Sequence, residues 1–229
     1  MDRPRMTVIL AFDCAGAVCS TLLWRDGETL ARRTRAQRHG QAEVLLPMIG
    51  ETLQEAGMGY GDLAAIATTT GPGSFTGLRV GLAAARGLRL ATGIKTVGVS
   101  TLEAAAHAVT EDERRGRAVL AAIDSRRDEI FVQAFDGDLK PLGAPAVLTP
   151  GAAAAAAPRG ALVLTGDAAQ PLLAALGGRN AKLARGAGAI DAAVVAALAA
   201  ARLGDKDLPP LRPLYLRPPD ITPQPARRK

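Results

Sequence analysis

The run Val8–Asp13, VILAFD, is a short continuous apolar stretch that ends in an aspartate, and this pattern predicts a buried strand. Residues 18–24 predict a second strand and residues 28–35 a third. Asp26 and Gly27 stand between these two runs, and this pair favours a tight hairpin turn. The chain is therefore expected to begin with three neighbouring strands.

After the third strand, helices are expected to alternate with strands. Residues 41–56 and 76–91 predict helices, and in the first of them apolar side chains recur at helical spacing on one face. Residues 63–69 and 95–99 predict the strands that follow each helix. Three strands followed by helix, strand, helix and strand are typical of the ribonuclease-H-like α/β lobe that actin, Hsp70 and sugar kinases carry twice.

The second half of the chain repeats the opening pattern. Ala118–Asp124 is another apolar run that ends in an aspartate, residues 129–135 predict the next strand, and a second Asp-Gly pair follows at 136–137. Nearly the same number of positions separates the two terminal aspartates and the two turn glycines. Further along, the sequence predicts helices at 149–157, 168–176 and 191–203 and a strand at 161–165.

This repetition predicts a two-lobed actin/Hsp70-like (ASKHA) ATPase fold. The lobes are of βββαβαβ type, and the second is reduced because its helical signals are short. We expect an N-terminal lobe over residues 1–100 and a C-terminal lobe over residues 101–229 that ends in a proline-rich tail.

The composition is that of a soluble globular protein, with 48% hydrophobic and 22% charged residues in 229. No apolar run reaches the roughly 20 residues that a membrane-spanning helix requires, so no membrane association is expected. Cys14 and Cys19 agree with a reducing compartment and do not suggest a disulfide scaffold. We therefore expect a cytoplasmic protein.

The chain is basic, with a net charge of +6, and a basic balance is compatible with a nucleic-acid partner. Scattered arginines can equally serve to solubilise a surface. No aromatic residues are interleaved with the basic ones in the sequence, as stacking platforms would be. The pattern therefore does not favour direct RNA binding.

The stretch from Gly71 to Arg79, GPGSFTGLR, has two interpretations. Glycines and a Ser74 or Thr76 cap before a helix can expose amides that bind an anion. The same residues can form a tight turn and a helix cap with no ligand, and the physical pattern alone favours this second interpretation. The stretch is not a Walker motif, because Gly-Lys-Ser/Thr is absent.

Cofactor and metal signals are weak. Asp13 ends the first strand, where ATPases of this fold hold a metal-bound nucleotide phosphate, but the residues after it carry no hydroxyl until Ser20. His39 and Glu43 could share a helix face, and the chain has only one other histidine, His107, far from them. We therefore expect no catalytic residue, no bound cofactor and no metal site.

The two predicted helices of the first lobe carry candidate partner contacts. One offers apolar anchors and the other a stripe of small residues at four-residue spacing, so the candidates are Leu45, Met48, Ile49, Gly77, Gly81 and Ala85. A small-residue stripe lets another element approach closely. That element could be a partner helix or the sheet of this lobe itself.

Five stretches of the chain resemble, in family order, successive motifs of the TsaB (YeaZ) family. They are Ile9–Asp13, His39 with 43–47, 70–81, 124–131 and 213–217. The Gly-Pro-Gly-Ser-Phe-Thr-Gly-Leu-Arg stretch is the most specific of them, and residues 150–203 carry little. Cys14 and Ala15 stand where the family usually has Thr-Ser, which argues further against a phosphate-binding role for Asp13.

The resemblance implies a role in forming the N6-threonylcarbamoyl group on the adenosine beside the anticodon, in tRNAs that read codons beginning with A. It implies that the related subunit TsaD carries the metal and transfers the group. A protein of this family would be a non-catalytic subunit that binds TsaD as a heterodimer, joins the ATPase TsaE in a larger complex and reaches tRNA through that complex. The resemblance and the predicted helix faces together suggest a homodimer when the chain is alone.

Two alternatives of the same fold remain. An ATP-dependent phosphotransferase would need an intact phosphate loop after Asp13, and an inactive metallopeptidase-like protein would carry more metal ligands than His39. ATP turnover or zinc content of the purified chain would separate these alternatives from the TsaB-like function.

Overall fold

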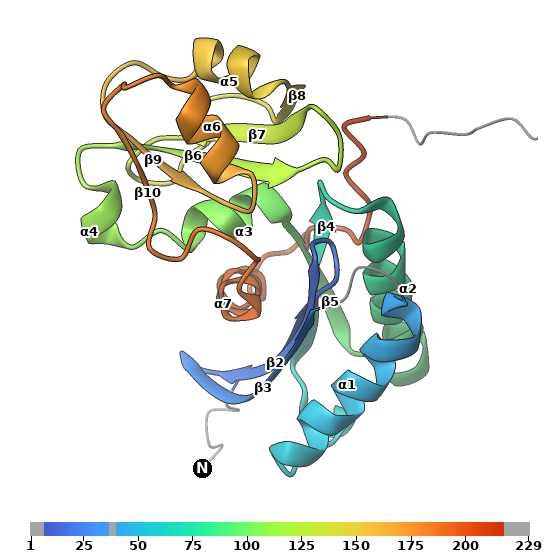
Figure 1. Cartoon of the computed structure of the whole chain (residues 1–229). Coiled ribbons are helices and arrows are strands. Elements are labelled where there is room, and N and C mark those ends of the chain that lie inside the picture. The colour runs from blue at the N-terminus through green and yellow to red at the C-terminus, as the bar shows by residue number, and fades with distance from the viewer. Residues whose placement is uncertain (1–6, 37–39, 218–229) are drawn as a thin grey trace, which may run out of the picture.

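The computed structural model describes residues 7–36 and 40–217. The first lobe contains a five-stranded sheet in the order β3-β2-β1-β4-β5 (Figure 1). Its elements are β1 (Val8–Asp13), β2 (Val18–Arg25), β3 (Glu28–Ala36), α1 (Gln41–Glu55), η1 (Tyr60–Asp62), β4 (Ala65–Gly71), α2 (Phe75–Thr92) and β5 (Lys95–Ser100). Strand β1 is antiparallel to β2 and parallel to β4. The apolar run that the sequence predicted as a buried strand is this β1, and it lies at the centre of the sheet.

The second lobe repeats this sheet, in the order β8-β7-β6-β9-β10. Its elements are α3 (Thr101–His107), α4 (Glu111–Arg114), β6 (Ala118–Asp124), β7 (Ile130–Phe135), β8 (Ala146–Leu148), α5 (Pro150–Ala156), β9 (Leu162–Thr165), α6 (Ala169–Ala175), β10 (Ala181–Leu183) and α7 (Ala192–Arg202). The predicted duplication is confirmed strand for strand. Two edge strands, β8 and β10, were not predicted, because three residues each give no periodic signal.

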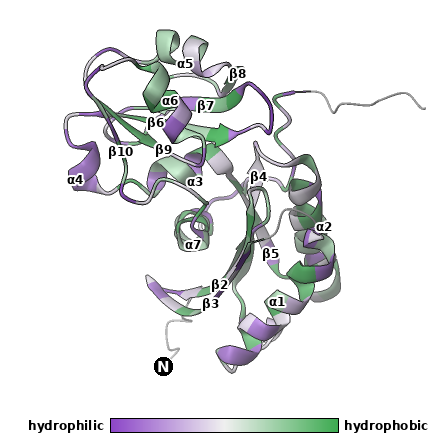
Figure 2. Ribbon diagram, in the orientation of Figure 1, coloured by the Kyte–Doolittle hydropathy of each residue, from purple (hydrophilic) through white to green (hydrophobic). Residues whose placement is uncertain are grey.

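Helices cover both faces of both sheets (Figure 1). In the first lobe α1 and α2 pack on one face and α7 on the other, while in the second lobe α5 and α6 pack on one face and α3 on the other. Helices α3 and α7 contact each other between the two sheets. Figure 2 shows the hydrophobic residues of α7 and of the second sheet that build these layers.

Helix α7 lies late in the chain but completes the first lobe. Ala192, Val195, Ala196 and Ala199 are buried against the first sheet, in one apolar cluster with residues of its strands. The division at residue 100 remains a prediction, and the packing shows that the first sheet depends on residues from beyond it. No helix among the described residues has both the length and the apolar character needed to cross a membrane.

The segment after α7 also returns to the first lobe. Pro209 accepts a hydrogen bond from the Gly98 N–H at 3.2 Å, and the Leu214 N–H donates to the Thr70 carbonyl oxygen at 2.8 Å. Leu211 between them is buried in the core of that lobe. Residues 209–217 therefore run along the carboxyl ends of β5 and β4 and end between the lobes.

A disulfide links Cys14 to Cys19 across the loop between β1 and β2. The sequence analysis did not predict this bond, because two cysteines alone did not suggest a disulfide scaffold and were compatible with a reducing compartment. The bridge spans only five positions and both side chains are buried. It holds one loop and is no scaffold for the lobe.

Candidate functional site

The first candidate surface, on α1 and α2, differs from the one that the sequence predicted. The structure buries all six residues proposed as partner contacts: Leu45, Met48, Ile49, Gly77, Gly81 and Ala85. The four with apolar side chains belong to the core cluster that joins both helices to the sheet. Burial leaves these six residues little surface for a second protein, although Leu45 also lines the groove described below, so their role as direct partner contacts remains a prediction.

The small-residue stripe of α2 serves close packing within the lobe. A Cβ atom at Gly77 would lie 1.8 Å from the carbonyl oxygen of Cys14, and one at Gly81 would lie 3.2 Å from the Thr68 hydroxyl. Helix α2 thus presses directly on the loop after β1 and on β4. The sequence left open whether a partner helix or the lobe's own sheet packs on this stripe. In the structure the lobe's own sheet and loop pack there.

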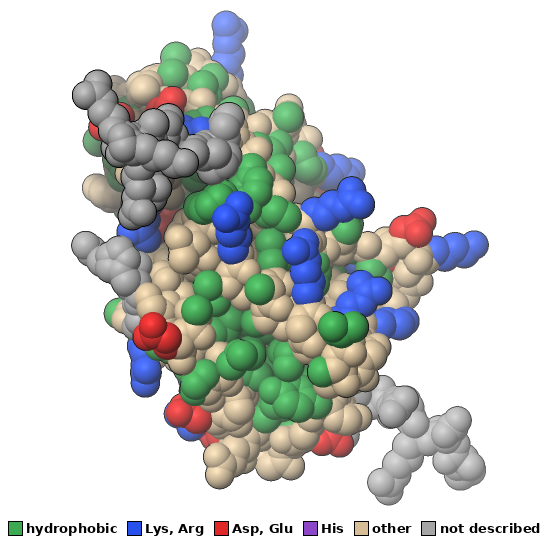
Figure 3. Space-filling model, turned by 90° about the vertical axis from the view of Figure 1, so that its right-hand side faces the viewer, with side chains coloured by type: hydrophobic (Ala, Val, Ile, Leu, Met, Phe, Trp, Pro, Cys, Tyr) green, Lys and Arg blue, Asp and Glu red, His purple; other side chains and the backbone are tan. Residues whose placement is uncertain are grey.

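The outer faces of the same helices form an apolar groove of about 650 Å³ (Figure 3). Its lining includes Ala42, Leu46, Phe75, Val80, Ala83, Ala84 and Leu88. Leu46 is 52% exposed and lies within this apolar lining. Arg79, Arg86 and Arg89 lie exposed on the same face of α2.

The Gly-Pro-Gly-Ser stretch works as a turn and a cap. The Ser74 hydroxyl accepts a hydrogen bond from the Gly77 N–H at 3.3 Å and so caps α2, while the Ser74 N–H donates to the Ala15 carbonyl oxygen at 2.7 Å. Gly71 adopts a φ of 105°, a conformation that glycine tolerates best. The predicted turn and helix cap are both present.

Asp13 lies in a closed environment. Its carboxylate accepts hydrogen bonds from the Thr69 hydroxyl at 2.5 Å and from the Ala15 N–H at 3.1 Å. Burial raises its pKa from 3.8 to about 6, although these hydrogen bonds oppose the rise. The adjoining cavity, which Asp167 of the other lobe also lines, has a volume of about 10 Å³. That space is no larger than a water molecule needs and is far too small for a nucleotide.

The metal candidates of the sequence do not meet in the described part of the chain. His39 lies outside the described residues, and Glu43 is exposed in the first turn of α1. His107 ends α3, where burial lowers its pKa. Among the described residues no three histidine, cysteine or acidic side chains stand close enough together to hold a metal ion.

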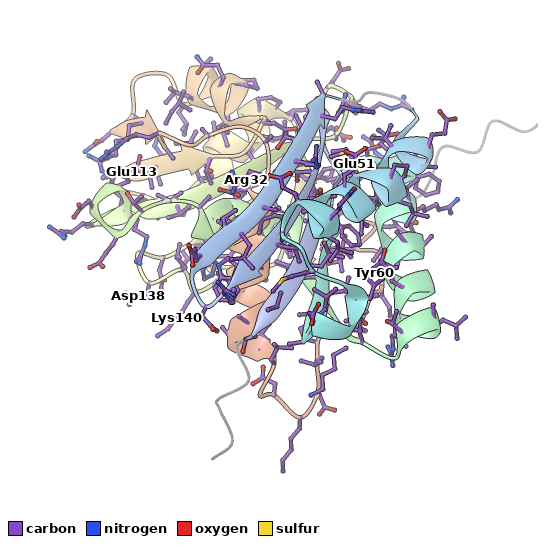
Figure 4. All side chains as sticks on the ribbon, turned by 90° about the horizontal axis from the view of Figure 1, so that it is seen from below. Arg32, Glu51, Tyr60, Glu113, Asp138 and Lys140 are labelled. Atoms are coloured by element: carbon purple, nitrogen blue, oxygen red, sulfur yellow. A yellow bond between two sulfur atoms is a disulfide. The ribbon has the colours of Figure 1, made fainter. Side chains whose placement is uncertain are left out.

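The arginines of the edge strand β3 tie elements together. Arg32 bonds Asp191 at the start of α7 at 2.5 Å, and Arg33 contacts Glu51 of α1 at 3.3 Å. Figure 4 shows Arg32 and Glu51 from below, on the strand and on the helix. These half-exposed pairs use much of the basic charge of β3 within the first lobe and its α7 cover.

A second hollow lies between the lobes and was not predicted from the sequence. It has a volume of about 520 Å³ and is lined by residues of the α2 start, the β6–β7 loop, β7 and the last described segment: Pro72, Gly73, Ser74, Phe75, Thr76, Ser125, Arg126, Arg127, Phe131, Leu214, Tyr215, Leu216 and Arg217. We call it the interlobe cleft. A signal for the cleft was present in the sequence, because three of the five stretches that resemble TsaB motifs supply its lining residues.

Comparison with known proteins agrees with this architecture. The family described as TsaD, tRNA N6-adenosine threonylcarbamoyltransferase, matches residues 32–185. The tRNA threonylcarbamoyladenosine biosynthesis protein TsaB of Escherichia coli K12 is 38% identical over 130 residues, which make up 57% of this chain and 55% of that protein. A protein of Mycobacterium tuberculosis described as uncharacterized is 33% identical over 225 residues, or 97% of this chain and 98% of its own length.

Solved structures show the same likeness. YeaZ from Pseudomonas aeruginosa has a TM-score of 0.76 and 29% identity, covering 92% of this chain and 100% of that one. Component A of the (R)-2-hydroxyglutaryl-CoA dehydratase of Acidaminococcus fermentans has a TM-score of 0.54 at 14% identity, a likeness of fold alone. The predicted two-lobed ASKHA-like fold is confirmed. The matched part spans about half the length of the Escherichia coli and Haemophilus influenzae TsaB proteins.

Proposed function

This chain belongs to the TsaB (YeaZ) family, and we propose that it is a non-catalytic subunit in the formation of N6-threonylcarbamoyladenosine in tRNA. In this proposal TsaD transfers the group, and the present chain binds and supports TsaD, with TsaE joining a larger complex. The modified adenosine is the one beside the anticodon of tRNAs that read codons beginning with A. This work takes place in the cytoplasm, where tRNA is modified.

The apolar groove between α1 and α2 carries the proposal. The exposed Leu46 and the half-buried Val80 and Leu88 line a hollow of about 650 Å³, and accessible apolar patches of this kind mark interaction sites. The partner's own first-lobe helices would fill it, because TsaD resembles this chain and two related folds can pair through equivalent surfaces. The exposed arginines of α2 would then meet acidic residues at the edge of the interface.

The cavity beside Asp13 is too small for a nucleotide, and this supports a non-catalytic role. A phosphotransferase of this fold needs room for a nucleotide beside the aspartate, and the cavity there holds about 10 Å³. The Gly77 backbone of α2 already packs against the loop that would have to wrap the phosphates. ATP hydrolysis by the purified chain at rates typical of an enzyme would contradict this part of the proposal.

Leu46→Asp tests the groove. A charge at this exposed position should leave the fold intact and abolish binding to TsaD, because an unpaired carboxylate would be buried in the interface. Leu142→Asp is the matched control, since Leu142 is 55% exposed on the other lobe. Isothermal titration with purified TsaD and threonylcarbamoyladenosine formation in the reconstituted system should both fail for Leu46→Asp alone. Normal binding by a folded Leu46→Asp variant would refute the proposed surface.

In the absence of TsaD we propose that a second copy of the chain occupies the same groove. Light scattering should then show a homodimer for the wild type and a monomer for Leu46→Asp. Titrating TsaD into the homodimer should produce one-to-one heterodimers. A homodimer that persists in the presence of saturating TsaD would place the two interfaces on different surfaces.

A further inference from the structure

The interlobe cleft gathers side chains that are scarce in this chain. The sequence has one tryptophan, two tyrosines and four phenylalanines. Three of these seven side chains, those of Phe75, Phe131 and Tyr215, line the cleft together with the side chains of Arg126, Arg127 and Arg217. The aromatic and basic residues lie far apart in the sequence and meet only in the fold. The sequence pattern could not show this gathering, because it compares only residues that are neighbours along the chain.

The aromatic residues are held in place. The rings of Phe75 and Tyr215 lie 5.3 Å apart between centroids, tilted by 36°. The Arg79 guanidinium stacks over the Phe75 ring at 3.7 Å and donates a hydrogen bond to the Tyr215 hydroxyl at 3.2 Å. Tyr215 nevertheless remains 40% exposed. It is a braced aromatic surface that borders a hollow, which is what a stacking nucleobase requires.

The arginines are oriented and still accessible. Arg126 pairs with Asp124 at 3.6 Å, and Arg217 pairs with Glu129, yet their side chains remain 42% and 29% exposed. A guanidinium has five N–H donors in a fixed plane, so one carboxylate partner leaves donors for a phosphate. The ion pairs therefore orient the guanidinium planes and reduce their charge only in part.

We propose that the interlobe cleft binds an unpaired nucleotide of an RNA strand, with its base on Tyr215 and its phosphate at the arginines of the β6–β7 loop. The inference rests on the proposed function, because it names the RNA contact of a subunit that acts on tRNA. Phe75 and Thr76 line both the cleft and the apolar groove. An RNA strand in the cleft would therefore lie directly beside the catalytic partner docked on α1 and α2.

A free nucleotide is the competing ligand of the same chemistry. The cleft offers separate guanidinium groups beside the turn at the start of α2, and it adjoins the proposed protein interface. Both features suit a strand that continues beyond the site. The test therefore includes ATP as a competitor.

The first measurement is fluorescence anisotropy with a labelled anticodon stem-loop RNA, using the full chain alone and in complex with TsaD. Tyr215→Leu should weaken binding about 5- to 100-fold through loss of base stacking, while Tyr215→Phe should bind within about threefold of the wild type. Equal binding by Tyr215→Leu and the wild type would overturn the stacking role. Thermal melting would show that both variants retain the fold.

The second measurement is the salt dependence of RNA binding. The exposed pair change Arg126→Gln with Arg127→Gln should lower the slope of log affinity against log salt by about 1 to 1.5, as expected for two lost phosphate contacts to a single strand. Arg159→Gln, at an exposed arginine outside the cleft lining, is the control and should leave the slope within about 0.3 of the wild-type value. An unchanged slope in the double variant would overturn the phosphate site.

Competition with ATP distinguishes an RNA strand from a free nucleotide as the ligand of the cleft. Millimolar ATP that displaces the RNA completely would assign the cleft to a free nucleotide and overturn the RNA strand. A failure of the inference is also distinguishable from a failure of the proposed function. If the cleft variants bind RNA normally while Leu46→Asp still blocks modification, the RNA site is refuted and the partner surface stands.

Discussion

The two lobes share one strand order and differ in the helices that cover it. In the first lobe α1 and α2 have 15 and 18 residues, whereas their counterparts α5 and α6 in the second lobe have 7 each. A helix of seven residues makes only two turns and offers little outer surface. The comparison teaches that the sheet is the repeated scaffold, and that the exposed apolar groove belongs to the lobe whose helices are long.

The inner faces of the sheets give a second comparison, because α3 covers the second sheet from nearby in the sequence, whereas α7 covers the first sheet from far along the chain. Val195 of α7 is fully buried against the first sheet. We expect Val195→Asp to unfold the chain, at a cost of more than about 4 kcal/mol, since it places an unpaired charge in a core. Ala197→Asp, at an exposed position of the same helix, should change stability by about 0.5 kcal/mol at most. Urea denaturation measures both, and a folded Val195→Asp variant would contradict the role of α7.

Each lobe also has a glycine that presses on the backbone of its central strand region. A Cβ atom at Gly77 would lie 1.8 Å from the Cys14 oxygen, and one at Gly166 would lie 2.1 Å from the Ala122 oxygen. Gly77→Ala and Gly166→Ala should each cost about 3 kcal/mol, because the backbone must shift. Gly87→Ala meets no atom within 4 Å and should stabilise α2 by about 0.5–1 kcal/mol. Equal stability of all three variants would show that neither Gly77 nor Gly166 is needed for close packing in its lobe.

The strand-ending aspartates differ in burial, since Asp13 is buried and Asp124 half-exposed. The raised pKa of Asp13 means that its stabilising contribution is complete below pH 3.8 and lost as the pH rises through about 6. Asp13→Asn should therefore stabilise the chain at pH 8 by up to about 3 kcal/mol and not at pH 3.5. Asp124→Asn is the control and should change stability less at both values. Threonylcarbamoyladenosine formation should persist in the Asp13→Asn complex.

The smallest expected effects concern the caps of one helix from each lobe, α2 and α5. Ser74 caps α2 through the Gly77 N–H, and Thr149 caps α5 through the Ala152 N–H, both at 3.3 Å. Ser74→Ala and Thr149→Ala should each cost about 1 kcal/mol. Differential scanning calorimetry would measure the two losses. A cost near zero for Thr149→Ala would show that the short α5 does not depend on its cap.

Much of the fold could be predicted from the sequence, because strong local signals coincide with the structure. The run Val8–Asp13 and the run Ala118–Asp124 are strands with the predicted bounds, and the helix predicted from residue 149 is α5, capped by Thr149. The position of α7 could not be predicted. Its alanine-rich sequence indicates a helix but carries nothing to say which of two sheets it covers.

The site was harder to predict for two physical reasons. Periodicity shows which residues of a helix share a face, and it placed Leu45, Met48 and Ile49 together, but the most apolar face is the one that turns to the core. The groove residues lie beside that face, and Leu45 belongs to both. The cleft required tertiary structure, since Tyr215 meets Phe75 from a segment that no local pattern connects with α2.

The return of α7 and residues 209–217 to the first sheet has a consequence for synthesis on the ribosome. The strands of the first lobe leave the ribosome first, yet their inner face stays uncovered until the helix at 192–202 has been made. Contacts between residues so far apart in sequence slow folding and prolong the exposure of apolar surface. The half of the protein that is translated first is thus completed last, and a ribosome that stalls before residue 192 holds a nascent chain whose first sheet still lacks the cover of α7.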